Sequence, residues 1–164
     1  MEWYTWVVLL HVLGAFGFVF GHGASAMVSF RLRSERSPER VATLLGVSTA
    51  GLIVTYVSLL VLIVAGVIAG FMGDWWGSGW LWAAIIVLVL MLAGMYAMAT
   101  PYYKQVRLAA GIPAPGAKPA DPAPEPMPTD QLALLLTSSR PMTLAWFGGI
   151  GLVVIIWLMV VKPF

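Results

Sequence analysis

Residues 41–71 read VATLLGVSTAGLIVTYVSLLVLIVAGVIAGF and contain no charged side chain. A helix needs about 20 mainly apolar residues to cross the hydrocarbon core of a bilayer. This stretch exceeds that minimum, which leaves room for tilt or for an extension beyond the hydrocarbon. We therefore expect a transmembrane helix here.

The composition of the whole chain is that of a membrane protein. Of its 164 residues, 60% are hydrophobic and 10% are charged, whereas a soluble domain has about 45–50% apolar and about 25% charged residues. The net charge of +2 comes without a concentrated basic face, so we expect no nucleic-acid partner. Cysteine is absent, which excludes disulfides, iron–sulfur clusters and covalent haem attachment through Cys-x-x-Cys-His.

Three more stretches are long and apolar enough to span a bilayer, at about residues 4–30, 80–100 and 142–161. Together with 41–71 they predict an all-α membrane protein, a four-transmembrane-helix bundle that forms a single domain over residues 1–164.

Two local signals bear on the limits of these spans. Ala24-Ser25-Ala26 resembles a signal-peptidase site, but no Lys or Arg precedes the apolar run, which continues to Phe30. We therefore expect a retained first span. The third span is expected to stop or kink near Pro101, because proline disfavours helix continuity.

The basic residues predict the orientation of the bundle. Eight of the nine fall in two connections, 31–40 and 101–140, and an excess of Lys and Arg marks the cytoplasmic side. The eight are Arg31, Arg33, Arg36, Arg40, Lys104, Arg107, Lys118 and Arg140. Tryptophans near the N-terminus and at 75–82 predict an aromatic belt on the opposite side. We expect a multi-pass protein of the bacterial plasma membrane with both termini non-cytoplasmic.

Residues 111–128 hold seven prolines and predict an extended, Pro-rich cytoplasmic linker. A short apolar helix is expected at 131–138, capped by Thr129 or Asp130. Residues 129–139 are either this short interfacial helix or the start of the fourth span with Pro141 as an internal kink.

The two histidines of the chain, His11 and His22, both lie in the first span. Eleven residues at about 100° each place both rings on one face of a straight helix, about 16 Å apart along the axis. Ionisable residues inside a membrane are candidates for a functional site. The alternative is that each ring is neutral and hydrogen-bonded to a neighbouring helix, for which Ser48, Thr55 and Ser58 of the second span are the natural partners.

Met91, Met95 and Met98 form a stripe on the third span, at i, i+4 and i+7. Thioethers together with imidazole suit Cu(I) or a Met-ligated haem, while methionine is also an ordinary gap-filler in apolar cores. The cofactor hypothesis therefore has His11 and His22 as ligands of haem, chlorin or copper, with these methionines as further metal ligands. It depends on whether the methionine stripe faces either histidine.

Three motifs carry a resemblance to a known family. Leu10-His11-Val12-Leu13-Gly14, Gly21-His22-Gly23 and the terminal 157–163 resemble a family of bacterial predicted four-helix integral membrane proteins of unknown function. A looser similarity extends to copper-resistance membrane proteins and to small haem-associated four-helix membrane proteins. It implies that a histidine site would be cofactor-related, although the chain lacks a second His-rich segment and a Lys within the third span.

Two functions remain in competition. The first is a non-enzymatic accessory or scaffold subunit of a larger membrane complex, held in the lipid bilayer with a membrane-protein partner or as a homo-oligomer, because small residues line several helix faces. The second is a cofactor-binding redox membrane protein that uses His11 and His22. The absence of charged residues from the central part of every span argues against ion-coupled transport.

Overall fold

The computed structural model describes residues 2–113, 117–118 and 122–164, and these residues form α-helices, one short 3₁₀ turn and connecting turns. Four helical segments are long and apolar enough to cross a membrane, the fourth being α4 and α5 taken together. The predicted all-α membrane fold is therefore confirmed. In chain order the elements are α1 (Glu2–Leu32), α2 (Pro38–Met72), η1 (Trp75–Gly77), α3 (Gly79–Ala109), α4 (Thr129–Leu136) and α5 (Arg140–Val161).

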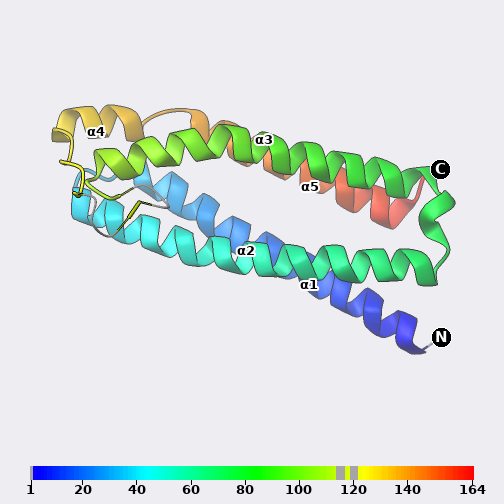
Figure 1. The fold of residues 1–164 in the computed structure, drawn as a ribbon. Coiled ribbons are helices and arrows are strands. Elements are labelled where there is room, and N and C mark those ends of the chain that lie inside the picture. The colour runs from blue at the N-terminus through cyan, green and yellow to red at the C-terminus, as the bar shows by residue number, and fades with distance from the viewer. Residues whose placement is uncertain (1, 114–116, 119–121) are drawn as a thin grey trace.

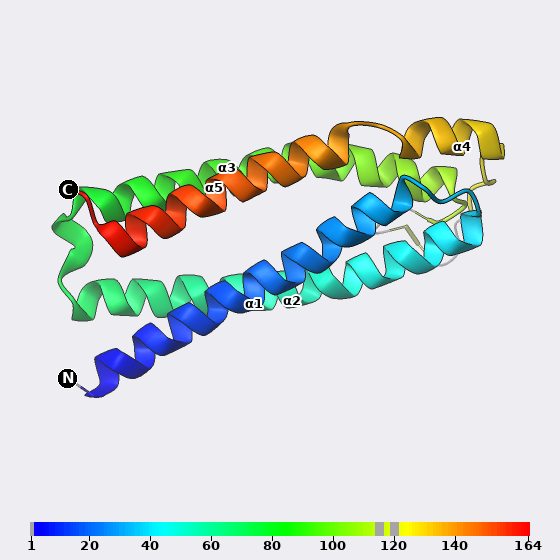
Figure 2. The same ribbon diagram turned by 180° about the vertical axis from the view of Figure 1, so that it is seen from behind.

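The long helices are arranged as two antiparallel hairpins (Figures 1 and 2). α1 packs along α2 to form the first hairpin, and α3 packs along α5 to form the second. Between the hairpins, the contact along the helices is a limited one of α1 with α5. Both termini lie at the same end of the molecule (Figure 1).

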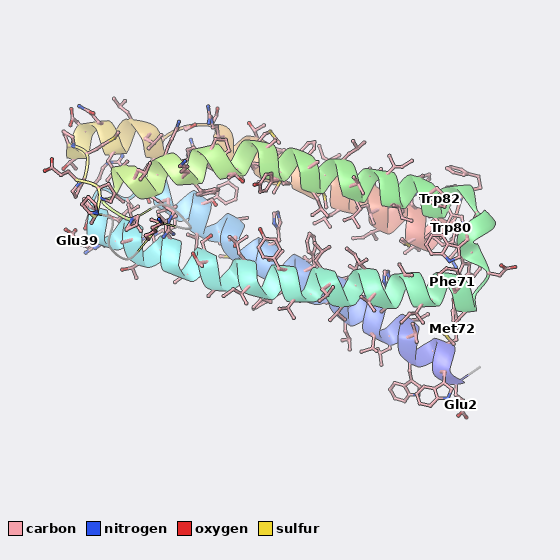
Figure 3. All side chains as sticks on the ribbon, in the orientation of Figure 1. Glu2, Glu39, Phe71, Met72, Trp80 and Trp82 are labelled. Carbon is pink, nitrogen blue, oxygen red and sulfur yellow. The ribbon has the colours of Figure 1, made fainter. Side chains whose placement is uncertain are left out.

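The two ends of the molecule differ in chemistry, and we name them accordingly. The basic end holds the α1–α2 turn, the end of α3, and α4; Glu39 lies there in Figure 3. The tryptophan end holds η1, Trp80 and Trp82, with Phe71 close by (Figure 3). The sequence prediction that arginines and tryptophans occupy opposite ends of the bundle agrees with this arrangement.

A buried cluster at the basic end joins the two hairpins. Val28 and Leu32 of α1 pack there with Tyr102 and Val106 of α3, and all are almost fully buried. A smaller cluster around Trp80 and Leu158 holds α3 against α5 at the tryptophan end. Lys162 makes a cation–π contact beside that cluster, with its Nζ 4.1 Å from the centre of the Trp75 ring.

Of the two outcomes expected near Pro101, a stop or a kink, the stop does not occur. α3 continues through Pro101 to Ala109. Proline removes one main-chain hydrogen bond and strains the preceding turn, but the following turns are held by tertiary packing. Tyr102, Val106 and Ala109 are at most 2% exposed in the basic-end cluster, and this burial stabilises the extra turns.

The sequence left two alternatives for residues 129–139, and the structure has a separate helix, α4, which begins at Thr129 after Pro128. The expected start at Gln131, with a cap from Thr129 or Asp130, is wrong by two residues. Pro141 lies in the first turn of α5, where its missing N–H costs nothing, and so is no internal kink. Leu132 and Leu136 of α4 are fully buried in the basic-end cluster.

The Pro-rich linker lies partly outside the described residues, at 114–116 and 119–121. Its two ends are attached to α3. The N–H of Ile112 donates to the Arg107 carbonyl at 2.8 Å, and the N–H of Met127 donates to the Ala109 carbonyl at 2.9 Å. The linker therefore leaves and returns at the same place on the basic end.

Candidate functional site: the histidines and the methionine stripe

His11 lies between α1 and α2 near the tryptophan end. Its Nδ1 is 2.8 Å from the main-chain carbonyl oxygen of Leu62. Since a carbonyl only accepts, Nδ1 carries the proton and donates, and Nε2 is not used by this bond. The ring rests on Gly66, where a Cβ would be 2.9 Å from Nδ1 and Cε1. His11 thus matches the prediction of a ring hydrogen-bonded to a neighbouring helix.

His22 lies in a different environment, between the two hairpins. Its ring stacks parallel to that of Phe18, with centroids 6.0 Å apart, and it makes no hydrogen bond to any described residue. Its Nε2 points at Gly148 of α5, where a Cβ would be 3.3 Å away. This half-buried ring is one of the places where the first hairpin meets the second within the membrane span.

The methionine stripe of α3 faces α5, where two of its members rest on glycines. Met91 lies on Gly151 and is almost fully buried. Met95 lies on Gly148, where a Cβ would be 3.7 Å from both its Sδ and its Cε. Met98 lines a separate depression at the basic end, beside Pro101 and Arg140.

Of the five candidate ligands, the structure brings two together. The Nε2 of His22 and the Sδ of Met95 both border the space above the Gly148 Cα, which is open because glycine has no Cβ. His11, Met91 and Met98 lie elsewhere. Nothing in the sequence marked Gly148 as their meeting point.

The histidines face different helices because of how α1 winds along α2. The residues of α1 that meet α2 include His11, Gly14, Gly17, Gly21 and Ser25, with a mean spacing of about 3.5 residues, as in a coiled coil. A straight helix drifts by about 20° per heptad from such a seam. His11 lies on the seam, whereas His22 directly follows a seam residue, Gly21, and is turned about 100° from it.

The hydroxyls predicted to bond the histidines serve the first hairpin instead. A Cβ at Gly17 would overlap the Oγ of Ser58, and one at Gly21 would lie 2.7 Å from the Oγ1 of Thr55. Thr55 donates to the Gly51 carbonyl of its own helix at 2.9 Å. These hydroxyls occupy the seam level with glycines of α1, so the predicted His–hydroxyl hydrogen bonds are wrong.

One link between the hairpins was missed by sequence reasoning. Tyr103 of α3 is hydrogen-bonded to the Oγ of Ser29 on α1. Ser29 donates to the Ser25 carbonyl at 2.8 Å, so the tyrosine hydroxyl is the donor to Ser29. Both residues were visible in the sequence as polar groups within apolar helices, but nothing local indicated that they meet.

A known protein family matches this chain. A family model described as "Predicted integral membrane protein (DUF2269)" matches residues 5–163. The chain belongs to this family. A comparison with curated protein sequences and one with solved structures each gave no match.

DUF2269 membership confirms the family resemblance inferred from the sequence motifs, because the match includes both histidine motifs and the whole terminal motif. It establishes an integral membrane protein, and the looser similarities to copper-resistance and haem-associated proteins find no support in it. Among the described residues, no group of three or more His, Asp or Glu side chains is placed to hold a metal ion.

Proposed function

We propose that this chain is a non-enzymatic accessory or scaffold subunit that joins a partner helix within the bacterial plasma membrane. The observation that carries the proposal is a second small-residue face on α2. Ala42, Gly46 and Ala50 follow one another at intervals of four residues, and Gly46 and Ala50 are exposed. A Cβ at Gly46 would meet no atom within 4 Å.

This face differs from the one that α2 uses inside the first hairpin. Gly51, on the internal face, lies close to Ser25 and to the Gly21 carbonyl, so small residues there let two backbones approach. Helix association in lipid depends on such close approach, because lipid chains are as apolar as leucine side chains. A free face of the same kind suits a helix of another subunit or of a second copy of the chain.

The test uses the absence of cysteine. Oxidation of the Ala50→Cys variant in native membranes should give a disulfide-linked dimer if the partner is a second copy. If it is not, a photoreactive crosslinker attached to that cysteine should give an adduct with another membrane protein. Gly46→Ile should abolish that product, whereas Ala93→Ile, at an exposed small residue of α3, should not. Two results together would contradict the proposal. The Ala50→Cys variant would give no crosslinked product, and light scattering would show the protein to be a monomer in mild detergent.

We propose further that the basic end is cytoplasmic, so that both termini are outside. The segregation of eight of nine basic residues supports this orientation. Ser34, in the α1–α2 turn, and Gly77, in η1, are exposed, and these two segments lie at opposite ends of the molecule (Figure 1). An impermeant thiol reagent added to intact cells should label Gly77→Cys and not Ser34→Cys. The reverse pattern would invert the topology.

A second candidate function is cofactor binding, favoured by the meeting of His22 and Met95 above Gly148. Imidazole and thioether together suit Cu(I) or a His–Met haem. His22 has no hydrogen bond to a described residue that ligation would break, and the missing Cβ of Gly148 leaves a methyl-sized space beside both ligand atoms.

Gly148→Ala separates this candidate from simple packing. The added methyl would be 3.3 Å from Nε2 of His22, which must move by a few tenths of an ångström, and 3.7 Å from Sδ and Cε of Met95, an ordinary contact. We expect Gly148→Ala, His22→Gln and Met95→Leu each to lose the visible absorption or the copper of the purified protein, and His11→Gln to keep them. Purified protein without a Soret band and without copper after reconstitution with Cu(I) or haem would overturn the candidate.

A further inference from the structure

We propose that the basic end seats the phosphates of anionic phospholipids in two grooves, one on each hairpin, next to Arg31 and Arg140. The first groove has a volume of about 490 Å³ and is lined by Met27, Val28, Phe30, Arg31, Ser34 and Leu44. The second has a volume of about 380 Å³ and is lined by Ala97, Met98, Pro101, Arg140, Thr143 and Leu144.

The two grooves share one arrangement of groups. Each combines a single arginine and a single hydroxyl with an apolar wall that includes a methionine. Arg31 lies in the last turn of α1 and Arg140 in the first turn of α5, so both guanidinium groups lie at the level where a membrane-spanning helix leaves the hydrocarbon. The apolar lining continues from there toward the middle of the span. A phospholipid matches this order, because its phosphate would lie next to the arginine and the upper part of an acyl chain would lie along the apolar lining.

Charge favours an anionic lipid over a zwitterionic one. Neither Arg31 nor Arg140 forms an ion pair with a described residue. The two basic connections carry eight Lys and Arg against five Asp and Glu. Glu35, the acid next to the first groove, accepts hydrogen bonds from the main-chain N–H groups of Arg36 and Ser37. These bonds are the main cause that lowers its pKa, and the charges of Arg40 and Arg31 lower it further. The bonds hold its carboxylate in the α1–α2 turn.

Pro101 adds a feature to the second groove. Because proline has no N–H, the carbonyl of Ala97 lacks its helical i+4 partner, and Ala97 and Pro101 both line the groove. A headgroup hydroxyl, such as that of a phosphatidylglycerol, would supply the missing donor. Arginine would bind the phosphate through paired N–H donors.

The experiment measures bound lipid by native mass spectrometry and thermal stability in detergent. Phosphatidylglycerol should bind in up to two copies and raise the melting temperature, whereas phosphatidylcholine and inorganic phosphate should do neither. Arg31→Gln and Arg140→Gln should each remove one bound lipid and weaken the affinity about fivefold, the effect of one cation near an anionic surface. The matched control is Arg40→Gln, since Arg40 is exposed at the same end but lines neither groove.

Three results would overturn the proposal. One is that the double variant Arg31→Gln/Arg140→Gln binds as much phosphatidylglycerol as the wild-type protein. Another is an equal loss of bound phosphatidylglycerol in Arg40→Gln, which would indicate that the basic end attracts anionic lipid as a whole and has no specific binding sites. The third is the same stabilisation by inorganic phosphate, which would indicate a site for free phosphate. If the double variant fails to fold, the single variants and Arg140→Lys, which keeps the charge without the paired donors, decide the question.

Discussion

The two hairpins use glycine in different ways. In the first, glycines of α1 face the backbone of α2: a Cβ at Gly14 would be 2.7 Å from the main-chain nitrogen of Leu62. In the second, glycines of α5 are sockets for side chains of α3, as Gly151 is for Met91. The reverse also occurs, since Phe147 of α5 fills the place beside Gly94 of α3. The first hairpin therefore includes backbone-to-backbone contacts at Gly14 and Gly21, alongside side-chain contacts such as that of His11 with Gly66. The glycine contacts of the second hairpin are with flexible or rotatable side chains.

A glycine inside a membrane span can therefore indicate either a close contact with a backbone or a space filled by a movable side chain. A backbone atom cannot move aside without moving its helix, whereas the end of a methionine can adopt another rotamer. The same Gly→Ala change should therefore destabilise the first hairpin much more than the second.

The largest effect is expected for Gly21→Ala. The new methyl would be 2.7 Å from the Gly51 carbonyl oxygen and 2.8 Å from the Thr55 nitrogen, so the helices must separate. We expect a loss of about 3 kcal/mol in the free energy of unfolding, which outweighs the gain of about 1 kcal/mol in helix propensity. Unfolding by SDS titration from mild detergent measures it.

Gly23→Ala is the matched control, two residues along the same helix. A Cβ at Gly23 would meet no atom within 4 Å, so this variant should be neutral or stabilised by up to about 1 kcal/mol. Equal losses in the two variants would show that the seam between α1 and α2 does not decide the stability of the first hairpin.

A smaller effect is expected where the hairpins are joined. Tyr103→Phe removes the hydrogen bond to Ser29 and should cost about 1 kcal/mol, the usual scale for a hydrogen bond between membrane helices. Tyr96→Phe is the control, because Tyr96 is 71% exposed. Thermal unfolding followed by tryptophan fluorescence would check both. A neutral Tyr103→Phe would mean that the apolar basic-end cluster holds the hairpins together by itself.

The effect of Gly151→Ala should be smaller again. Its methyl would approach Met91 most closely at the Sδ, at 2.8 Å, and the thioether can turn away. We expect a loss below about 1 kcal/mol by the same SDS titration, since propensity offsets part of the strain. A loss as large as that of Gly21→Ala would remove the proposed difference between the hairpins.

The histidines give the smallest pair of effects. His11→Leu removes the hydrogen bond to Leu62 and should cost about 0.6 kcal/mol. His22→Leu, in protein without added metal or haem, should change stability by no more than about 0.3 kcal/mol, because His22 has no hydrogen bond to a described residue to lose. A larger loss at His22 than at His11, measured by thermal unfolding, would indicate that His22 holds a ligand in the purified protein.

Much of the fold could be predicted from one-dimensional properties of the chain. The number of spans follows from apolar length, as in residues 41–71, because every backbone group in lipid must be paired within a helix. The separation of Arg31 and Arg140 from Trp75 and Trp80 follows from the order of the spans, since each crossing exchanges one side of the bilayer for the other. The family resemblance could likewise be stated from short motifs.

Only the tertiary structure decided what each polar or small residue faces. His11 and His22 share a face on a straight helix, but α1 follows a seam along α2, and a rotation of a few tens of degrees sends one ring to α2 and the other to α5. The continuation of α3 past Pro101 likewise depends on the burial of Tyr102 and Val106 by residues distant in the chain. Apolar length and the order of charges can be read directly from the sequence. The rotation of a helix and the burial of its residues depend on contacts with residues that are distant in the chain, and the sequence alone does not show which residues these are.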